Sequence, residues 1–240
     1  MNYLAVLLII GLLILIHELG HFIAARAVGV PIEVFSVGFG PALWKKTIGG
    51  TEYRLSLVPL GGYVLPAVKD EQDYFRIPIY KRIIFSLGGP AANLLPILIL
   101  FGALNILQAG FSFAGIAIEP FRQTADLIHR IFIAFGNLFA KPGNVSGIVG
   151  ILHDGGKFIG GDGVNAIRLT VIISANLAIF NLLPLPVLDG GKILFCILEK
   201  ISVRLRPLFV PIMVIGWLLI IGLMIYATVM DVGRLLVSYA

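Results

Sequence analysis

The sequence predicts an α-helical integral membrane protein with about four transmembrane helices. Of its 240 residues, 58% are hydrophobic and only 13% are charged, whereas soluble domains carry about 25% charged residues. Four apolar runs have the roughly 20 residues that a helix needs to cross the hydrocarbon core of a bilayer. A membrane β-barrel would show alternating apolar and polar residues instead of such runs. We therefore interpret residues 1–240 as a single transmembrane domain.

The four predicted spans cover residues 4–28, 83–107, 167–188 and 208–229. The first has no basic residue before it, so we interpret it as a retained span rather than a cleaved signal peptide. A further segment, 124–139, mixes apolar residues with Asp126, His129 and Arg130, which favours an amphipathic helix at the membrane surface. It lies in the connection 108–165, whose glycine-rich part at 143–163 predicts a loop.

Lysine and arginine gather in two of the connections. The loop between the first and second spans and the loop between the third and fourth are both basic, whereas the N-terminal tail has no basic residue. By the positive-inside rule, both loops face the cytoplasm and both termini face outward. We expect a multi-pass protein of the inner (plasma) membrane. The basic residues at 200–206 are expected to contact anionic headgroups rather than nucleic acid.

The first basic loop, residues 31–80, also carries a β-strand signal. Turn-forming residues at 38–41 and 59–64 flank the β-prone stretch 52–58. We expect a short hairpin or small sheet against the cytoplasmic side of the membrane.

A metal-binding motif lies inside the first predicted span. His17, Glu18 and His21 form HExxH, in which the two histidines share one helix face and can bind one zinc ion. The glutamate is placed to act as a general base on a metal-activated water. An ionised side chain at the centre of a membrane helix costs about 2.5–3.5 kcal/mol on insertion scales. Leu4 to His17 covers about 20 Å of helix, which places the motif near the cytoplasmic side.

Catalytic zinc usually has three protein ligands, so a third ligand is required. His129 and His153 both lie outside the predicted spans. Asp189 is the better candidate, because it follows a span that Pro184 and Pro186 interrupt, and a carboxylate there needs a partner. Irregular backbone at membrane depth is tolerated where it lines a cavity. We expect one Zn²⁺ per chain, held by the HExxH histidines and Asp189.

The sequence resembles the site-2 protease family of intramembrane zinc metalloproteases. The resemblance rests on HELGH at 17–21 and NLLPLPVLDGG at 181–191, with GFGP at 38–41, PLGGYV at 59–64 and GPAAN at 89–93. It implies a zinc metalloendopeptidase that cleaves within or near the transmembrane segment of a single-span or signal-peptide-like substrate. In this reading the Glu18-activated zinc water attacks the scissile carbonyl.

The resemblance also implies substrate-binding positions. Asn181 would bind the substrate backbone or stabilise the oxyanion. Gly61 and Gly62 would belong to a membrane-reentrant β-element that holds the substrate as an added strand. Asn93 and Asn176 are interpreted instead as residues that pack helices together. Many relatives carry PDZ domains between the second and third spans, whereas the short 108–165 connection shows no PDZ-like run of strands, so we expect no PDZ domain there.

Two other functions are weighed against the protease. A catalytically silent membrane scaffold could bind zinc or peptides, but it would not need Glu18. A metal transporter usually shows repeated halves, and none is visible here. A zinc protease with a glutamate ligand on a downstream helix outside the hydrocarbon is disfavoured, because no such glutamate competes with Asp189.

Overall fold

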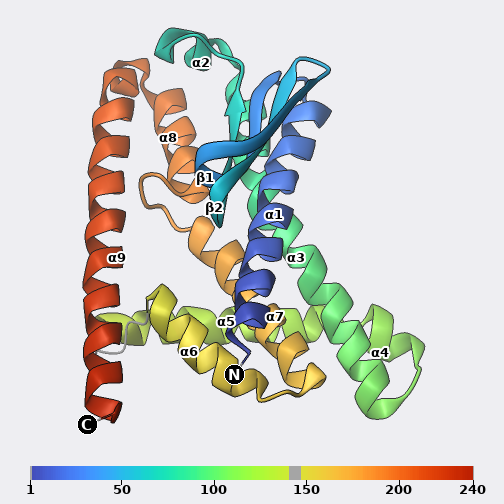
Figure 1. Ribbon diagram of the computed structural model, residues 1–240. Helices are drawn as coiled ribbons and strands as arrows, with labels where there is room; N and C mark the ends of the chain where they lie inside the picture. The colour runs from blue at the N-terminus through green and yellow to red at the C-terminus, as the bar shows by residue number, and fades with distance from the viewer. Residues whose placement is uncertain (1, 141–146, 240) are drawn as a thin grey trace. The chain divides into compact units, whose positions relative to one another are not determined.

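The computed structural model describes residues 2–140 and 147–239 and is mostly helical (Figure 1). Within these described residues, four helices are long and apolar enough to cross a membrane, at Tyr3–Ala27, Ile79–Ala109, Gly163–Asn181 and Val203–Arg234. They correspond to α1 (Tyr3–Ala27), α3 (Ile79–Ala109), α7 (Gly163–Asn181) and α9 (Phe209–Tyr239). The predicted fold class, a helical membrane protein with about four spans, is confirmed.

The other α-helices in the described residues are not among these candidate spans. They are α2 (Glu71–Arg76), α4 (Phe113–Ala117), α5 (Glu119–Ala140), α6 (Ile148–Ile159) and α8 (Asp189–Ile201), and the 3-10 helix η2 (Val203–Leu208) directly precedes α9. α5 contains the predicted amphipathic segment 124–139 and begins five residues earlier.

The loop predicted for 143–163 is wrong over α6, and residues 143–146 lie outside the described part of the chain. Glycine is compatible with α6 because its glycine face packs closely. A Cβ on Gly155 would lie 3.3 Å from Val6, and one on Gly156 would lie 2.9 Å from Tyr3.

The third span is shorter than predicted, because α7 ends at Asn181 rather than at Leu188. Residues 182–188 form turns, since Pro184 and Pro186 cannot continue a helix. Asp189 then begins α8, so the region after it is a helix and not the short loop that the sequence predicted. The turns fold tightly onto α8: a Cβ on Gly190 would lie 2.1 Å from the Leu182 carbonyl oxygen.

The hairpin predicted within residues 31–80 is present as two long, bent strands, β1 (Ile32–Ile48) and β2 (Thr51–Pro66), which pair antiparallel. The connecting turn lies at Gly49 and Gly50, whose φ angles of 58° and 82° favour glycine. The first half of β1 pairs with both ends of β2, so that Val37 lies opposite Leu55 and also opposite Gly62. The last residues of β1 pair with the first residues of β2, as in Ile48 with Thr51. Among the described residues, the Gly62–Pro66 part pairs on one side only, with β1.

The chain divides into two compact units, each described by itself. One contains residues 1–9, 96–176 and 214–240; the other contains residues 10–95 and 177–213. In the second unit, the end of α1 packs against the sheet through a core of Ala25, Val30, Ile32, Phe35 and Val64.

In the same unit, α1 and α3 cross in direct backbone contact. A Cβ on Gly20 would lie 2.3 Å from the Gly88 carbonyl oxygen, and one on Gly88 would lie 2.5 Å from the Gly20 carbonyl oxygen. Small residues at a crossing let two membrane helices approach closely. The contact holds the HExxH helix directly against α3.

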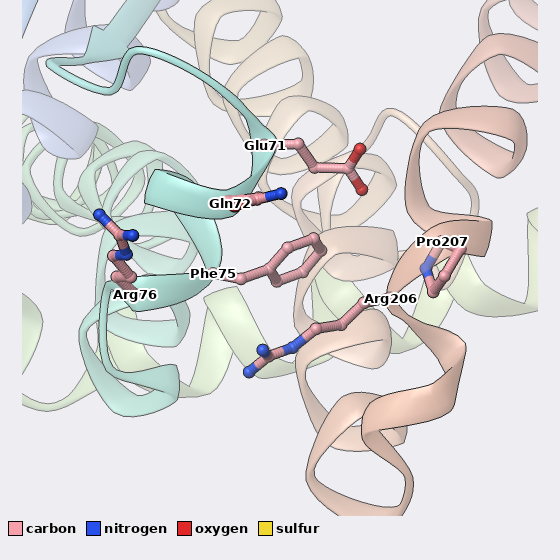
Figure 2. A pocket seen from close by; sticks show the side chains of 6 residues that line it. All are labelled: Glu71, Gln72, Phe75, Arg76, Arg206 and Pro207. Carbon is pink, nitrogen blue, oxygen red and sulfur yellow. The ribbon is translucent and has the colours of Figure 1, made fainter.

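A buried ion-pair cluster joins α3, α8 and η2. The Arg82 guanidinium donates to Glu199 at 2.6 Å, and Arg206 donates to the other Glu199 oxygen at 2.8 Å. Arg82 and Glu199 are only 2% and 1% exposed. A pocket of about 470 Å³ lies beside this cluster. Figure 2 shows its lining side chains, with the Phe75 ring above the Arg206 side chain in this view. None of the six residues that line the pocket is a predicted site residue.

Candidate metal centre

The two HExxH histidines and Asp189 converge on one point. His17 Nε2 and His21 Nε2 are 3.2 Å apart, and Asp189 Oδ2 lies 3.2 Å from the first and 3.1 Å from the second. Tetrahedral zinc with ligand bonds of about 2.05 Å separates neighbouring ligand atoms by about 3.3 Å. The three atoms therefore form a nearly equilateral triangle of the size that one face of a zinc tetrahedron requires.

All three side chains are buried, with exposed fractions of 7%, 6% and 3%. Among the described residues they are the one group of histidine, cysteine and acidic side chains close enough to hold a metal ion together. Two imidazoles and one carboxylate are donors that suit zinc.

α1 supplies two of the donors because His17 and His21 are four residues apart in a regular helix and share a face. Glu18 is adjacent and half-buried. Strand β2 passes close to it, since a Cβ on Gly62 would lie 2.7 Å from Glu18 Cγ. Glycine at this position therefore lets a strand backbone lie beside the carboxylate.

The third donor is fixed by its own helix. Asp189 begins α8, and Lys192, one turn later, donates to Asp189 Oδ1 at 3.0 Å, which leaves Oδ2 for the histidines. Burial by itself raises the pKa of this carboxyl. The Lys192 charge and the contacts with both histidines outweigh that effect, so the pKa lies well below its usual range. The carboxylate form is the one that binds metal.

Backbone geometry before Asp189 is unusual. Val187 has a φ of 78°, a region that β-branched residues rarely adopt. Its N–H points at the sulfur of Met213 at 3.4 Å. Uncommon backbone conformations of this kind cluster at functional sites.

Helix α3 lines the other side of the centre with three residues spaced four apart. His21 Nδ1–H donates to the Phe85 carbonyl oxygen at 2.7 Å, and the Asn93 amide lies 3.1 Å from His17 Nδ1. Gly89 lies between them. A Cβ there would fall 2.4 Å from His21 Nε2 and 2.5 Å from His17 Nε2. Only glycine therefore leaves space for an ion in front of both nitrogens.

The predicted site residues fall into two groups. His17, Glu18, His21, Asp189 and Gly62 lie together around the centre. Gly61 contacts Phe39, and the Asn181 amide donates to the Leu177 carbonyl oxygen at 2.9 Å within α7. Their predicted substrate contacts stay predictions.

Sequence reasoning missed the α3 residues and Lys192. Asn93 was assigned to helix packing, yet its amide faces a ligand histidine. The signal available was the spacing of Gly89 and Asn93 on one helix face, but nothing in the sequence says which helix lies against HExxH. Lys192 falls in the basic loop that the sequence predicts between the third and fourth spans, where no helix was expected.

The model of peptidase family M50 matches residues 5–225. The chain belongs to this family, the site-2 protease family. The matched range includes every residue of the candidate centre. A zinc metalloprotease with membrane helices is what the family and the structure together support.

Individual relatives agree with the family. A protein of Campylobacter jejuni named "Putative zinc metalloprotease" is 28% identical over an alignment that covers 98% of this chain and 94% of the relative. A Clostridium perfringens protein with the same description is 25% identical, covering 94% and 97%. A Chlamydia pneumoniae relative is 44% identical, but the chain spans only 18% of its length. The Campylobacter alignment has 346 positions, so at least 106 of them have no counterpart in this chain of 240 residues.

Proposed function

We propose that this protein is an intramembrane zinc metalloprotease that hydrolyses peptide bonds within or near the transmembrane segments of membrane-bound substrates. The observation that carries the proposal is the triangle of His17 Nε2, His21 Nε2 and Asp189 Oδ2, with sides of 3.1–3.2 Å, whose two histidines lie in a helix of membrane-spanning length. Glu18 adjoins this triangle, as a general base must. A scaffold would require the triangle but not the glutamate.

The chemistry divides between the ion and the chain. Bound at this triangle, Zn²⁺ would act as a Lewis acid toward the scissile carbonyl and would lower the pKa of a water. Glu18 accepts a proton from that water as its oxygen bonds to the carbonyl carbon. Glu18 then returns the proton to the amide nitrogen as the C–N bond breaks, so that the products are a free amine and a carboxylic acid, which releases its own proton to the amine or to solvent.

Substrate is proposed to bind as an extended strand beside β2. A helix hides its amides in intrahelical hydrogen bonds, so a peptide must unwind before its carbonyl can reach the centre. The Gly62–Pro66 edge pairs on one side only, and a peptide that added there would gain backbone hydrogen bonds. Gly62 adjoins Glu18, which supports cleavage at that edge. Asn181 is proposed to contact the substrate backbone or the oxyanion.

The cellular setting is proposed from charge and depth. Because two of the connections are basic, we propose that the hairpin and the centre lie near the cytoplasmic face of the inner (plasma) membrane, with both termini outside. The substrate is proposed to be a single-span or signal-peptide-like membrane protein.

Glu18→Gln tests the proposal, because it keeps the shape of the side chain and removes the base. The full chain and the variant are purified in mild detergent, bound zinc is measured, and cleavage of a tagged single-span substrate is followed. We expect about one zinc per chain in both proteins and cleavage by the wild type alone. Cleavage that survives in Glu18→Gln would refute the mechanism, and equal zinc with no cleavage by either protein would favour the scaffold.

A further inference from the structure

A histidine that binds a metal through Nε2 must carry its proton on Nδ1, because the Nε2 lone pair is used by the metal. Both Nε2 atoms face the triangle, so both Nδ1 atoms face outward. The partner of each Nδ1 therefore decides whether that ring is ready to bind.

His21 Nδ1 has two backbone neighbours, and the nearer one can only accept. The Phe85 carbonyl oxygen lies 2.7 Å from His21 Nδ1, whereas the Gly89 nitrogen, a donor, lies 3.3 Å away, so the shorter contact favours the Nδ1–H form of this ring. His21 is thereby kept in its metal-binding tautomer by the backbone of α3.

His17 has a partner of a different kind. Its Nδ1 lies 3.1 Å from the amide of Asn93, which is fully buried. A carboxamide offers an N–H₂ donor at one end and a carbonyl acceptor at the other, and a half-turn exchanges them. In the structure the amide nitrogen faces Nδ1, and His17 Nε2 lies 3.2 Å from Asp189 Oδ2. These two contacts fit a His17 ring that carries its proton on Nε2 and donates it to the Asp189 carboxylate.

We propose that Asn93 is a positioning residue whose amide turns over when the metal binds. Without metal, Asn93 Nδ2–H donates to His17 Nδ1 while His17 Nε2–H donates to Asp189. With metal, the proton lies on His17 Nδ1 and is donated to the Asn93 carbonyl oxygen. The inference rests on the metal centre of the proposed function and adds the group that holds His17 in both states.

The placement of Asn93 distinguishes this role from helix packing. Asn105, Asn176 and Asn181 each donate to a main-chain carbonyl oxygen, which is the usual use of an amide in a membrane helix. Asn93 instead faces a ligand ring, on the same face of α3 as Phe85 and Gly89. The three positions follow each other at one helical turn each, and they cover both histidines of α1.

Asn93→Asp and Asn93→Leu test the inference in the full chain, purified in detergent, stripped of metal and titrated with Zn²⁺ against a chelator of known affinity. Aspartate can only accept, so it favours the Nδ1–H form, and we expect it to keep zinc affinity within about threefold of wild type or to raise it. Leucine can neither donate nor accept, and we expect zinc affinity to fall about 10- to 100-fold. The melting temperature of each metal-free protein is measured alongside, because helix packing alone would change that temperature without separating the two variants in zinc affinity.

Asn105→Leu is the matched control, because it removes a partly buried amide from the same helix about 18 Å away along its axis. We expect its zinc affinity to equal that of wild type. The inference is overturned if Asn93→Leu binds zinc within threefold of wild type, or if Asn93→Asp loses as much affinity as Asn93→Leu. If Asn93→Leu does not fold, Asn93→Ala takes its place with the same criteria. A wild-type protein that binds no zinc would refute the metal centre itself, so the two failures are distinguishable.

Discussion

Gly89→Ala should greatly weaken zinc binding while adding only one methyl group. The added Cβ would lie 2.4 Å from His21 Nε2 and 2.5 Å from His17 Nε2. Ordinary contact begins near 3.4 Å, so each nitrogen would have to move by about 1 Å. Metal–ligand distances tolerate about 0.2 Å. The substitution therefore exceeds the tolerance of the site by about fivefold.

The methyl group would also compete with the ion for the same space. Two nitrogens 3.2 Å apart restrict a zinc ion bonded to both at about 2.05 Å to a small circle around their midpoint. A Cβ at 2.4–2.5 Å from the same atoms lies within about 3.1 Å of every point on that circle. We expect zinc affinity to fall by at least about 100-fold, which is about 2.7 kcal/mol.

The assay is zinc titration against a chelator, with thermal unfolding of the metal-free protein measured in parallel. Gly102→Ala is the control, because Gly102 lies on the same helix and its Cβ would meet no atom closer than 3.8 Å. We expect wild-type affinity in the control. A folded Gly89→Ala protein that binds zinc as wild type does would refute the reasoning, because the ion would then not occupy the space in front of both nitrogens.

Two further predictions concern what holds the centre in place. Glu199→Gln should destabilise the fold by about 3–5 kcal/mol, because it leaves the buried Arg82 guanidinium without its counter-charge. Burial raises the pKa of the nearby Cys196 thiol, so little reactive thiolate forms near pH 8. The wild-type protein should therefore react slowly with a maleimide. The Glu199→Gln variant should react faster, because the loss of the ion pair opens this region. Gly20→Ala should force α1 and α3 apart at a 2.3 Å contact, costing about 1–3 kcal/mol and weakening zinc binding.

Controls for these two predictions come from nearby or similar positions. Glu71→Gln, in the exposed wall of the pocket beside the ion-pair cluster, should change stability by less than about 0.5 kcal/mol. Gly222→Ala, in a spanning helix with no atom within 4 Å of the added Cβ, should leave zinc affinity unchanged. An unaltered Cys196 labelling rate in Glu199→Gln would contradict the stabilising role of the cluster. An unaltered melting temperature in Gly20→Ala would contradict the close helix contact.

The local sequence pattern was sufficient to predict the membrane spans and most of the metal ligands. Twenty apolar residues have few alternatives to a helix in a bilayer, because every backbone polar group must be satisfied within the segment. HExxH fixes two donors on one face through helical periodicity alone. Asp189 could be inferred because a carboxylate after an apolar run needs a partner.

Tertiary structure decided what no single segment contains. Apolar periodicity does not locate the end of a span that prolines interrupt. The start of α8 at Asp189 is therefore decided by residues 182–188, which fold back on Gly190. Likewise, Gly89 and Asn93 look like ordinary packing residues until α3 is placed against α1. Their role depends on which side chain lies across the helix interface, and sequence spacing encodes positions along one helix but not the identity of its neighbour.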